Sequence, residues 1–342
     1  MMGVTHVRIG ILYYIILSMT AIPLITTLPL VSGMNSNRIS LVGILVVAIA
    51  AAMPDMDCQH SIINQINPVT GLTNKIIEFI TRGLELIVRL VFSIGIAILI
   101  IKYAPQIIAQ IEHIQSLKQY ADIITYGTSI LLIISGVIGG SAIISIPLLG
   151  EGYKNIISLI RKGDSFFKRI VMFLVYAGTG IFIIIYNYKQ VNDSVLYLVG
   201  VLVIAAVIFP HRTFLHSTEG LCLFSFCAFH LSQKIGYSYL GSAFFLGYSS
   251  HLYLSDMFTK EGVPLSIIPR IVKKIGIYER FSKNKLFSLV YNVLNIRLRI
   301  PISSTGTKTG NKIEACYVLI LIVIATVVAF EYGIALSNIR VI

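Results

Sequence analysis

Long apolar stretches that lack charged residues constrain this chain more than any other feature. Several of them run for 17 residues or more, the length at which an α-helix begins to span the apolar core of a bilayer. Charged residues make up only 12% of the chain, against about a quarter in an ordinary soluble domain. The sequence therefore predicts an all-α fold, a polytopic integral membrane helical bundle that forms a single domain over residues 1–342.

Nine apolar segments are expected, at residues 10–33, 40–53, 84–102, 122–149, 169–187, 195–209, 216–232, 238–258 and 313–335. Two of them, 40–53 and 195–209, are shorter than the roughly 20 residues that cross a bilayer without tilt. Each short segment stops at a proline, Pro54 or Pro210, and polar residues follow at once. Short helices are tolerated at membrane depth where their ends line an enclosed or wet cavity. Both ends therefore predict one polar pocket.

Basic residues are unevenly distributed along the chain. Residues 259–312 contain eleven Lys and Arg against two acidic residues, and residues 150–168, which we expect to form a loop, are also basic. In membrane proteins an excess of basic residues marks the cytoplasmic side. Counting spans from these two stretches places the N-terminus and the ends of the second, sixth and eighth segments on that side too. The chain is thus predicted to be a multi-pass protein of the cell (inner or plasma) membrane.

The net charge of +12 raises two classes of partner, nucleic acid and anionic lipid. Basic loops of membrane proteins report topology and contact anionic lipid, so we expect membrane lipid as a partner and no nucleic acid. Within the basic segment 259–312, apolar residues recur at helical spacing. They are Leu286, Leu289, Val290, Val293 and Ile296. This pattern predicts an amphipathic helix that lies either on the headgroup layer or against the protein itself.

Seven ionisable residues fall on the predicted cytoplasmic side, at or beside the ends of apolar segments. They are His6, Asp55, Asp57, His211, His216, His251 and Asp256. Ionisable groups at membrane depth are costly unless they are paired or wet, and imidazole and carboxylate are common metal ligands. The charge bias and the positions of these residues are unrelated signals that agree. The sequence therefore predicts a metal site at the cytoplasmic face, with these seven residues as ligands.

The spacing of these residues limits how each is presented. Asp55 and Asp57 cannot share a helix face, but an extended turn can aim both carboxylates at one cation; a solvated helix end is the other interpretation. His211 and His216 stand about 140° apart around a helix. We therefore expect His211 in the turn after Pro210, and His216 in the first turn of the next helix.

Arg212 lies between the two histidines of that turn. Its guanidinium offers five donors in a fixed fork, which suits recognition of phosphate or carboxylate; a snorkelling role at the interface is the alternative. His251 and Asp256 end the eighth segment. Either both are ligands, or the aspartate orients the imidazole from behind.

Four sequence blocks, in this order, carry a resemblance to a known family: Gly3–His6, Pro54–Asp57 with Ser61, His211–Ser217 and Gly247–Leu265, with a weaker fifth at Gly310–Glu314. The chain resembles the YdjM-like family of LexA-regulated, membrane-bound, metal-dependent hydrolases. The resemblance implies a helical protein with a His/Asp metal cluster, similar to zinc-dependent phospholipases C and P1-type nucleases. The chain departs from the family pattern at Cys58, where a histidine is common, and in the fourth block, where His and Asp stand five residues apart instead of four.

These inferences combine into a membrane-bound metal-dependent hydrolase that acts on a phosphoester such as a phospholipid headgroup. The expected cofactor is a divalent metal, Zn²⁺, which supplies Lewis-acid catalysis. Asp55 or Asp57 would act as the base, and Arg212 would hold the anion. Two alternatives stay open: a metal or ion transporter that uses the same cluster as a transit site, and a non-catalytic membrane protein with a fully ligated structural metal.

Overall fold

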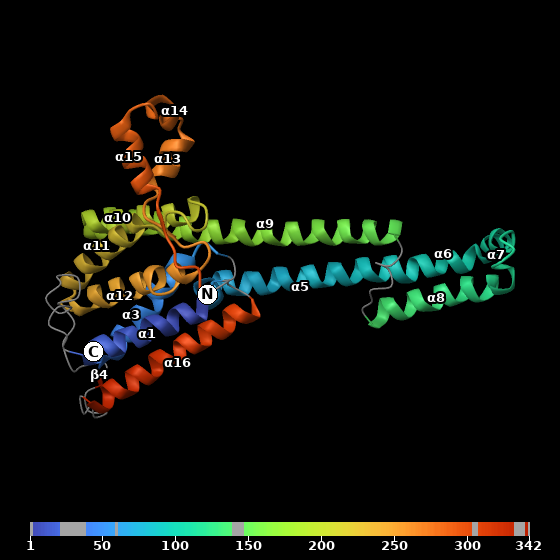
Figure 1. The fold of residues 1–342 in the computed structure, drawn as a ribbon, viewed down its shortest axis with the longest axis horizontal. Coiled ribbons are helices and arrows are strands. Elements are labelled where there is room, and N and C mark those ends of the chain that lie inside the picture. Colours follow the sequence, from blue (N-terminus) through green and yellow to red (C-terminus); the bar gives the residue numbers. More distant parts are fainter. Residues whose placement is uncertain are drawn as a thin grey trace. The chain divides into compact units, whose positions relative to one another are not determined.

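The computed structural model describes residues 3–20, 39–58, 61–138, 147–302, 307–331 and 339–340, and these residues are almost entirely helical (Figure 1). Contacts divide the chain into two compact units. The first comprises Met1–Pro68 and Met172–Ile342, and the second comprises Val69–Val171. The expectation of a single membrane domain stays a prediction.

The first unit is built mainly from six helices and the last part of α9 (Pro147–Tyr186). The six are α1 (Gly3–Met19), α3 (Leu41–Ala52), α10 (Ser194–Ile208), α11 (Thr218–Lys234), α12 (Tyr239–Tyr253) and α16 (Lys308–Glu331). α12 packs against α3, α11 and α1, and α1 also contacts α3 and α16. Small residues permit this packing, since a Cβ on Gly247 of α12 would lie 2.5 Å from the backbone oxygen of Val47 on α3. α12 is therefore the central helix of this unit.

The two short apolar helices, α3 and α10, begin and end with local signals. The Ser40 side chain caps α3 by accepting a hydrogen bond from Gly43 N at 3.1 Å, and Asp193 caps α10 in the same manner. α3 runs into the 3₁₀ turn η1 (Met53–Asp55), which contains Pro54. α10 ends where Phe209 becomes extended before the proline that follows it. Both helices thus stop at a proline and lead directly into polar residues.

Short elements follow these helices in the first unit. α4 (Ile62–Ile66) lies beyond η1, and η6 (Asp256–Phe258) follows α12. β2 (Val263–Pro264) pairs antiparallel with β3 (Arg297–Leu298), and β1 (Ile39–Ser40) pairs parallel with β4 (Ile339–Arg340).

The chain between β2 and β3 forms three helices, α13 (Ile268–Lys274), α14 (Ile277–Phe281) and α15 (Lys285–Leu294). We call residues 263–298 the basic arm. The amphipathic helix expected from the sequence is α15. Its Tyr291 ring packs 4.4 Å from that of Tyr278 in α14, while Leu286 and Leu289 are exposed. One face of α15 therefore packs within the arm, and another stays open.

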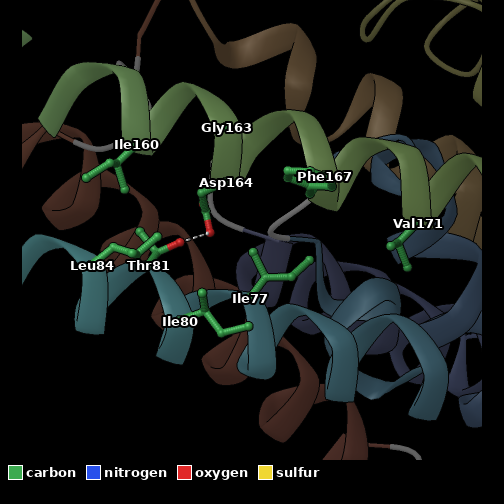
Figure 2. Close-up of a pocket in the computed structure, with 9 residues that line it drawn as sticks. All are labelled: Ile77, Ile80, Thr81, Leu84, Ile160, Gly163, Asp164, Phe167 and Val171. Atoms are coloured by element: carbon green, nitrogen blue, oxygen red, sulfur yellow. Dashed lines mark hydrogen bonds between the residues drawn. The ribbon is translucent and has the colours of Figure 1, made fainter. Parts of the chain in front are cut away.

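The second unit runs from α5 (Pro68–Leu90) through the π-helical turn η2 (Val91–Gly95), α6 (Ile96–Lys102), α7 (Ala104–Glu112), η3 (Lys118–Tyr120) and α8 (Ala121–Ile138) into α9. α6 packs on α8 around Ala97 and Leu132. Side chains of α5 and α9 line an apolar groove of about 420 Å³ (Figure 2).

Residues 150–168 belong to α9, so the prediction of a basic loop there is wrong. Tertiary contacts explain the helix. Arg161 Nε lies 2.7 Å from Glu85 Oε1 on α5, and Phe167 lines the groove between the two helices. Charged and apolar residues alternate at helical spacing because one side of this helix covers the groove and the other is exposed.

Within the described residues, four helical stretches are long and apolar enough to cross a membrane: Pro68–Lys102, Lys118–Val137, Gly150–Val191 and Lys308–Glu331. Shorter apolar helices cover Gly3–Met19, Leu41–Asp55, Ser194–Ile208 and Lys285–Leu294. Each expected apolar segment contains a helix, and residues 21–33, 139–146 and 332–335 of those segments lie outside the described part. The predicted helical membrane bundle is confirmed.

Candidate metal centre

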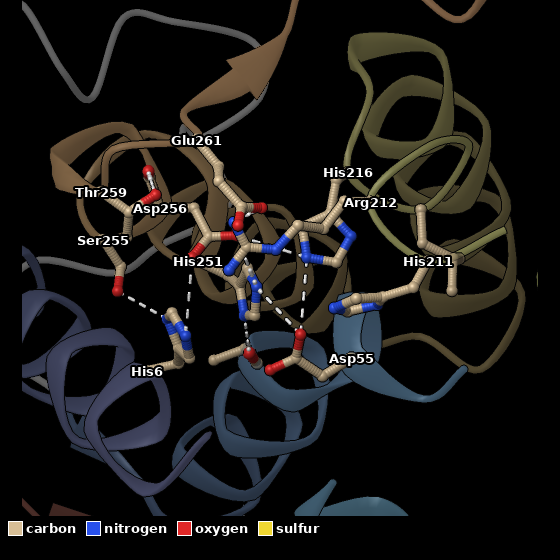
Figure 3. Close-up of polar contacts among 12 residues, drawn as sticks. His6, Asp55, His211, Arg212, His216, His251, Ser255, Asp256, Thr259 and Glu261 are labelled. Carbon is tan, nitrogen blue, oxygen red and sulfur yellow. Dashed lines mark hydrogen bonds and ion pairs between the residues drawn. The ribbon is translucent and has the colours of Figure 1, made fainter. Parts of the chain in front are cut away.

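Six of the seven candidate ligands lie in two adjoining groups (Figure 3). The first group is His6, His251 and Asp256, and the second is Asp55, His211 and His216. Within each group, one ligand atom from each residue lies within 4.8 Å of the others. These residues come from α1, η1, the turn between α10 and α11, α12 and η6. Segments far apart in the sequence thus deliver their polar residues to one place.

Imidazoles and carboxylates alternate around a common centre. His216 Nε2 lies 3.3 Å from Asp256 Oδ2 and 3.4 Å from Asp55 Oδ1. His251 Nε2 lies 3.5 Å and 3.8 Å from the same two oxygens. The two aspartates therefore link the two groups, and Nε2 of His216 and Nε2 of His251 each lie near both carboxylates.

Three buried ring nitrogens lack a hydrogen-bond partner among the described residues: His251 Nε2 and both nitrogens of His216. His251 Nδ1 lies 2.7 Å from Ala51 O. Because a carbonyl oxygen only accepts, Nδ1 carries the proton and Nε2 keeps its lone pair. Buried polar atoms are rarely left unpaired, because each one costs about 1–3 kcal/mol of folding free energy. A cation among these nitrogens would use the lone pairs, so the residues present fit a bound metal ion.

The two carboxylates make this centre favour positive charge. Burial lowers the pKa of His216, but contacts with Asp256 and Asp55 outweigh it and raise the pKa to about 9. Burial raises the pKa of Asp256, but His251 and His216 hold that pKa well below its usual range. The positive charge can reside on the His216 ring or on a bound cation, which competes with the proton for the ring nitrogen.

His6 is held in place by a contact that sequence reasoning missed. Its Nδ1 shares a 2.5 Å hydrogen bond with Ser255 Oγ, and its Nε2 lies 3.7 Å from Asp256 Oδ1. The His6 ring stacks on that of His251 with centroids 3.9 Å apart. A hydrogen bond behind a histidine fixes its ring orientation. The only sequence signal for Ser255 is its place beside Asp256.

Asp57 belongs to neither group. Its Oδ1 lies 2.7 Å from His211 Nδ1. The chain around η1 thus separates the two carboxylates: Asp55 lies at the centre, and Asp57 lies against Nδ1 of His211. This geometry suits an aspartate that orients a ligand, and a direct bond from Asp57 to metal stays a prediction.

Residues 1–334 match the model of the YdjM inner membrane protein family. The chain belongs to this family. The match also spans residues 62–194, which lie between the second and third blocks. No curated protein and no solved structure matches the chain at a significant level.

In this YdjM-family chain the turn between α10 and α11 is fixed by hydrogen bonds. Ser217 caps α11 through its side chain, and Tyr248 donates to Leu215 O at 2.7 Å. His216 therefore sits just before the cap, and its predicted place in the first helical turn is wrong. The capping preference of serine explains the difference.

Arg212 adopts a left-handed backbone conformation, with φ 59°. A residue with a side chain rarely does so, and such strain is concentrated at functional sites. Arg212 Nη1 lies 2.5 Å from Glu261 Oε2. Glu261, the partner of Arg212, is a residue that sequence reasoning missed, like Ser255. In the structure the predicted anion-binding arginine is thus paired with an internal carboxylate.

The end of α12 absorbs the extra residue of the fourth block. α12 ends at Tyr253, Ser255 adopts φ −136° and ψ −70°, and η6 begins at Asp256. His251 and Asp256 consequently meet across a turn and not along one helix face.

Proposed function

We propose that this YdjM-family membrane protein is a metal-dependent hydrolase that cleaves a phosphoester, such as that of a phospholipid headgroup. The observation that carries the proposal is the set of buried His216 and His251 nitrogens that face the carboxylates of Asp55 and Asp256 and have no hydrogen-bond partner among the described residues. A set of imidazole nitrogens and carboxylate oxygens suits Zn²⁺. When bound, such an ion supplies Lewis-acid catalysis.

The side chains around the centre divide the remaining tasks. Asp55 is 21% exposed whereas Asp256 is 3% exposed, so Asp55 is the carboxylate that substrate can approach and that would accept a proton. Asp57 would keep His211 in orientation. Arg212, in its left-handed turn, would bind the anionic group of the substrate.

A structural ion is the second candidate role. The ligand side chains of the first group, His6, His251 and Asp256, are all at most 3% exposed. Fully ligated, buried sites are typical of structural metals, and catalytic sites keep an open position. In that case the protein would bind metal tightly and hydrolyse nothing.

Metal analysis of detergent-purified protein, followed by activity assays on the same sample, tests the proposal. We expect a transition metal, mainly zinc, in stoichiometric amount, and hydrolysis of a phosphomonoester or of phospholipid in mixed micelles that stops on chelation. Metal without hydrolysis of any phosphoester would favour the structural role. Protein that binds no divalent metal would contradict both roles.

We also propose that the centre faces the cytoplasm, because the basic arm follows it directly in the chain. We expect Asn292→Cys, exposed on α15, to resist a membrane-impermeant thiol reagent in intact cells. Gln233→Cys, exposed at the opposite end of α11 from His216, should react. The parent protein would carry serine in place of the exposed Cys222 and Cys316. The reverse labelling pattern would invert the topology.

A further inference from the structure

Arginines from two separate segments converge beside the metal centre. Arg212 Nη1 contacts Glu261 Oε2 at 2.5 Å, and Arg297 Nη2 donates to Gly262 O at 3.2 Å. Arg299 packs on the same spot, since a Cβ on Gly262 would meet Arg299 Cβ at 2.5 Å. All three therefore gather on the dipeptide Glu261–Gly262, close after Asp256 in the chain.

The two-stranded pair β2–β3 holds two of these arginines, Arg297 and Arg299, in place. Gly262 turns the chain with φ +61°, and Pro264 then pairs with Arg297 across the strands. Ile300 N donates to Met257 O at 2.7 Å. This bond fastens the end of the basic arm to η6, the element that carries Asp256. Backbone pairing thus ties the segment of Arg297 and Arg299 to the element that carries Asp256.

Positive charge exceeds negative charge at this spot. Burial and the positive charge of Arg270 lower the pKa of Arg297. The charge of Glu261 opposes this decrease, and those of Arg212 and Arg299 add to it. The Glu261 side chain is 65% exposed. Arg297 Nε is buried and has no hydrogen-bond partner among the described residues. Arg212 therefore has an exposed carboxylate as its partner, and Arg297 keeps a buried donor without a hydrogen-bond partner among the described residues.

We propose that Arg212, Arg297 and Arg299 form a binding site for a phosphate group, and that Glu261 occupies Arg212 until a phosphate displaces it. A guanidinium fork matches phosphate oxygens in a bidentate manner. A solvent-exposed carboxylate is a weak competitor for such a fork because its charge is screened. The site would present the phosphoester to the adjacent ligands. That last role rests on the proposed hydrolase function, whereas phosphate binding itself does not.

The test is calorimetric titration of inorganic phosphate into the full-length protein in detergent, after metal has been removed with a chelator. Without metal, any phosphate bound is held by the chain itself. We expect Arg297→Gln to weaken phosphate binding at least about tenfold, since it removes charge-assisted hydrogen bonds. Arg280→Gln is the matched control, because Arg280 is exposed on α14 of the same arm and loses the same charge. Equal weakening in both variants, or no phosphate binding by the wild type, would overturn the proposal.

Glu261→Gln supplies a readout that misfolding cannot imitate. We expect it to tighten phosphate binding, because Arg212 loses its internal competitor. Unchanged or weaker binding would refute the displacement step. Metal content should stay at the wild-type level in this variant and in Arg297→Gln.

Two further arms identify the source of the phosphate and separate this proposal from the hydrolase. Mixed micelles containing phosphatidic acid should displace inorganic phosphate if a lipid headgroup is the ligand, and micelles of phosphatidylcholine alone should not. Displacement by neither would identify a soluble phosphate compound. In hydrolysis assays of the metal-loaded protein, Arg297→Gln should raise KM and leave kcat little changed. An unchanged KM would contradict the arginine site and leave the hydrolase proposal standing. Phosphate binding without any hydrolysis would support the arginine site and contradict the hydrolase proposal.

Discussion

Charged residues behave differently in the two units of this molecule. In the second unit, the basic residues of three ion pairs each meet a carboxylate: Arg82 with Glu78 at 2.5 Å, Arg161 with Glu85 at 2.7 Å and Lys168 with Asp164 at 3.0 Å. In the first unit, the centre keeps three buried imidazole nitrogens that have no hydrogen-bond partner among the described residues. The charges of these three pairs are thus balanced within the second unit, whereas the metal centre keeps polar atoms without a hydrogen-bond partner.

The apolar groove of the second unit illustrates the contrast. Its single carboxylate, Asp164, accepts a hydrogen bond from Thr81 at 3.1 Å (Figure 2) and is also neutralised by Lys168. Nothing about Asp164 calls for a further cation. At the centre, two carboxylates face imidazoles that keep buried ring nitrogens without a hydrogen-bond partner among the described residues. An acidic residue inside a membrane protein therefore indicates a metal site only when the side chains that face it still have buried nitrogen or oxygen atoms without a hydrogen-bond partner.

Removal of His216 should have the largest effect on the metal centre of the first unit. We expect His216→Ala to lower metal affinity more than loss of a residue that only orients a ligand, which costs roughly 10–100-fold. The substitution removes the imidazole that lies between the two carboxylates. Metal content of matched detergent preparations measures the effect. His113→Ala in the second unit is the control, since His113 is exposed and is a member of neither ligand group. Unchanged metal in His216→Ala would remove His216 from the site.

Arg212→Lys separates binding of metal from binding of substrate. Lysine keeps the charge and loses the bidentate fork. Metal content should stay at the wild-type level, while hydrolysis of a phosphoester falls. Activity equal to the wild type would exclude Arg212 as an anion binder.

Metal removal should act on stability through the first unit alone. A ligand that binds only the folded state at 100 times its dissociation constant stabilises it by about 2.7 kcal/mol. We therefore expect a chelator to lower the thermal unfolding midpoint of the wild type and to leave that of His216→Ala unchanged. A chelator-induced decrease of the same size in both proteins would show that metal binds elsewhere.

Ser255→Ala should have a smaller effect than loss of a ligand. Ser255 contacts the far nitrogen of His6 and so orients the ring. Loss of such a partner costs about 10–100-fold in metal affinity, so we expect a weaker but occupied site. Metal titration monitored by calorimetry would measure the change. An affinity equal to that of the wild type would mean that stacking on His251 suffices to orient His6.

Local signals explain why much of the fold was predictable. Apolar runs determine where helices form in lipid, and Pro54 and Pro210 stop α3 and α10 at polar residues. The residues of the centre were predictable because they stand at or beside the ends of these apolar runs. The bond between His6 and Ser255 joins positions 249 residues apart, and it depends on how α1 packs on α12. No local pattern contains that information.

The same limit explains the wrong prediction for residues 150–168. Their charges resemble those of a cytoplasmic loop, yet Arg161 pairs with α5 and Phe167 covers the groove. Whether such a stretch is a loop or a helix depends on a partner helix about 80 residues earlier, as the separation of 76 between Arg161 and Glu85 illustrates. Glu261 was missed similarly, because its importance comes only from meeting Arg212.

The smallest effect is expected in the second unit, where charges are already paired. Arg161→Gln removes one side of an ion pair whose arginine is 69% exposed, and exposed pairs contribute little because water screens them. We expect no measurable change in metal content or thermal midpoint. Lys168→Gln, on the same helix, removes the same charge from a side chain that is only 7% exposed. It should lower the midpoint, because Asp164 would keep a charge in the groove with Thr81 as its remaining partner there. Metal content should stay unchanged in this variant too. Loss of metal on either substitution would mean that the charges of the second unit also act on the centre.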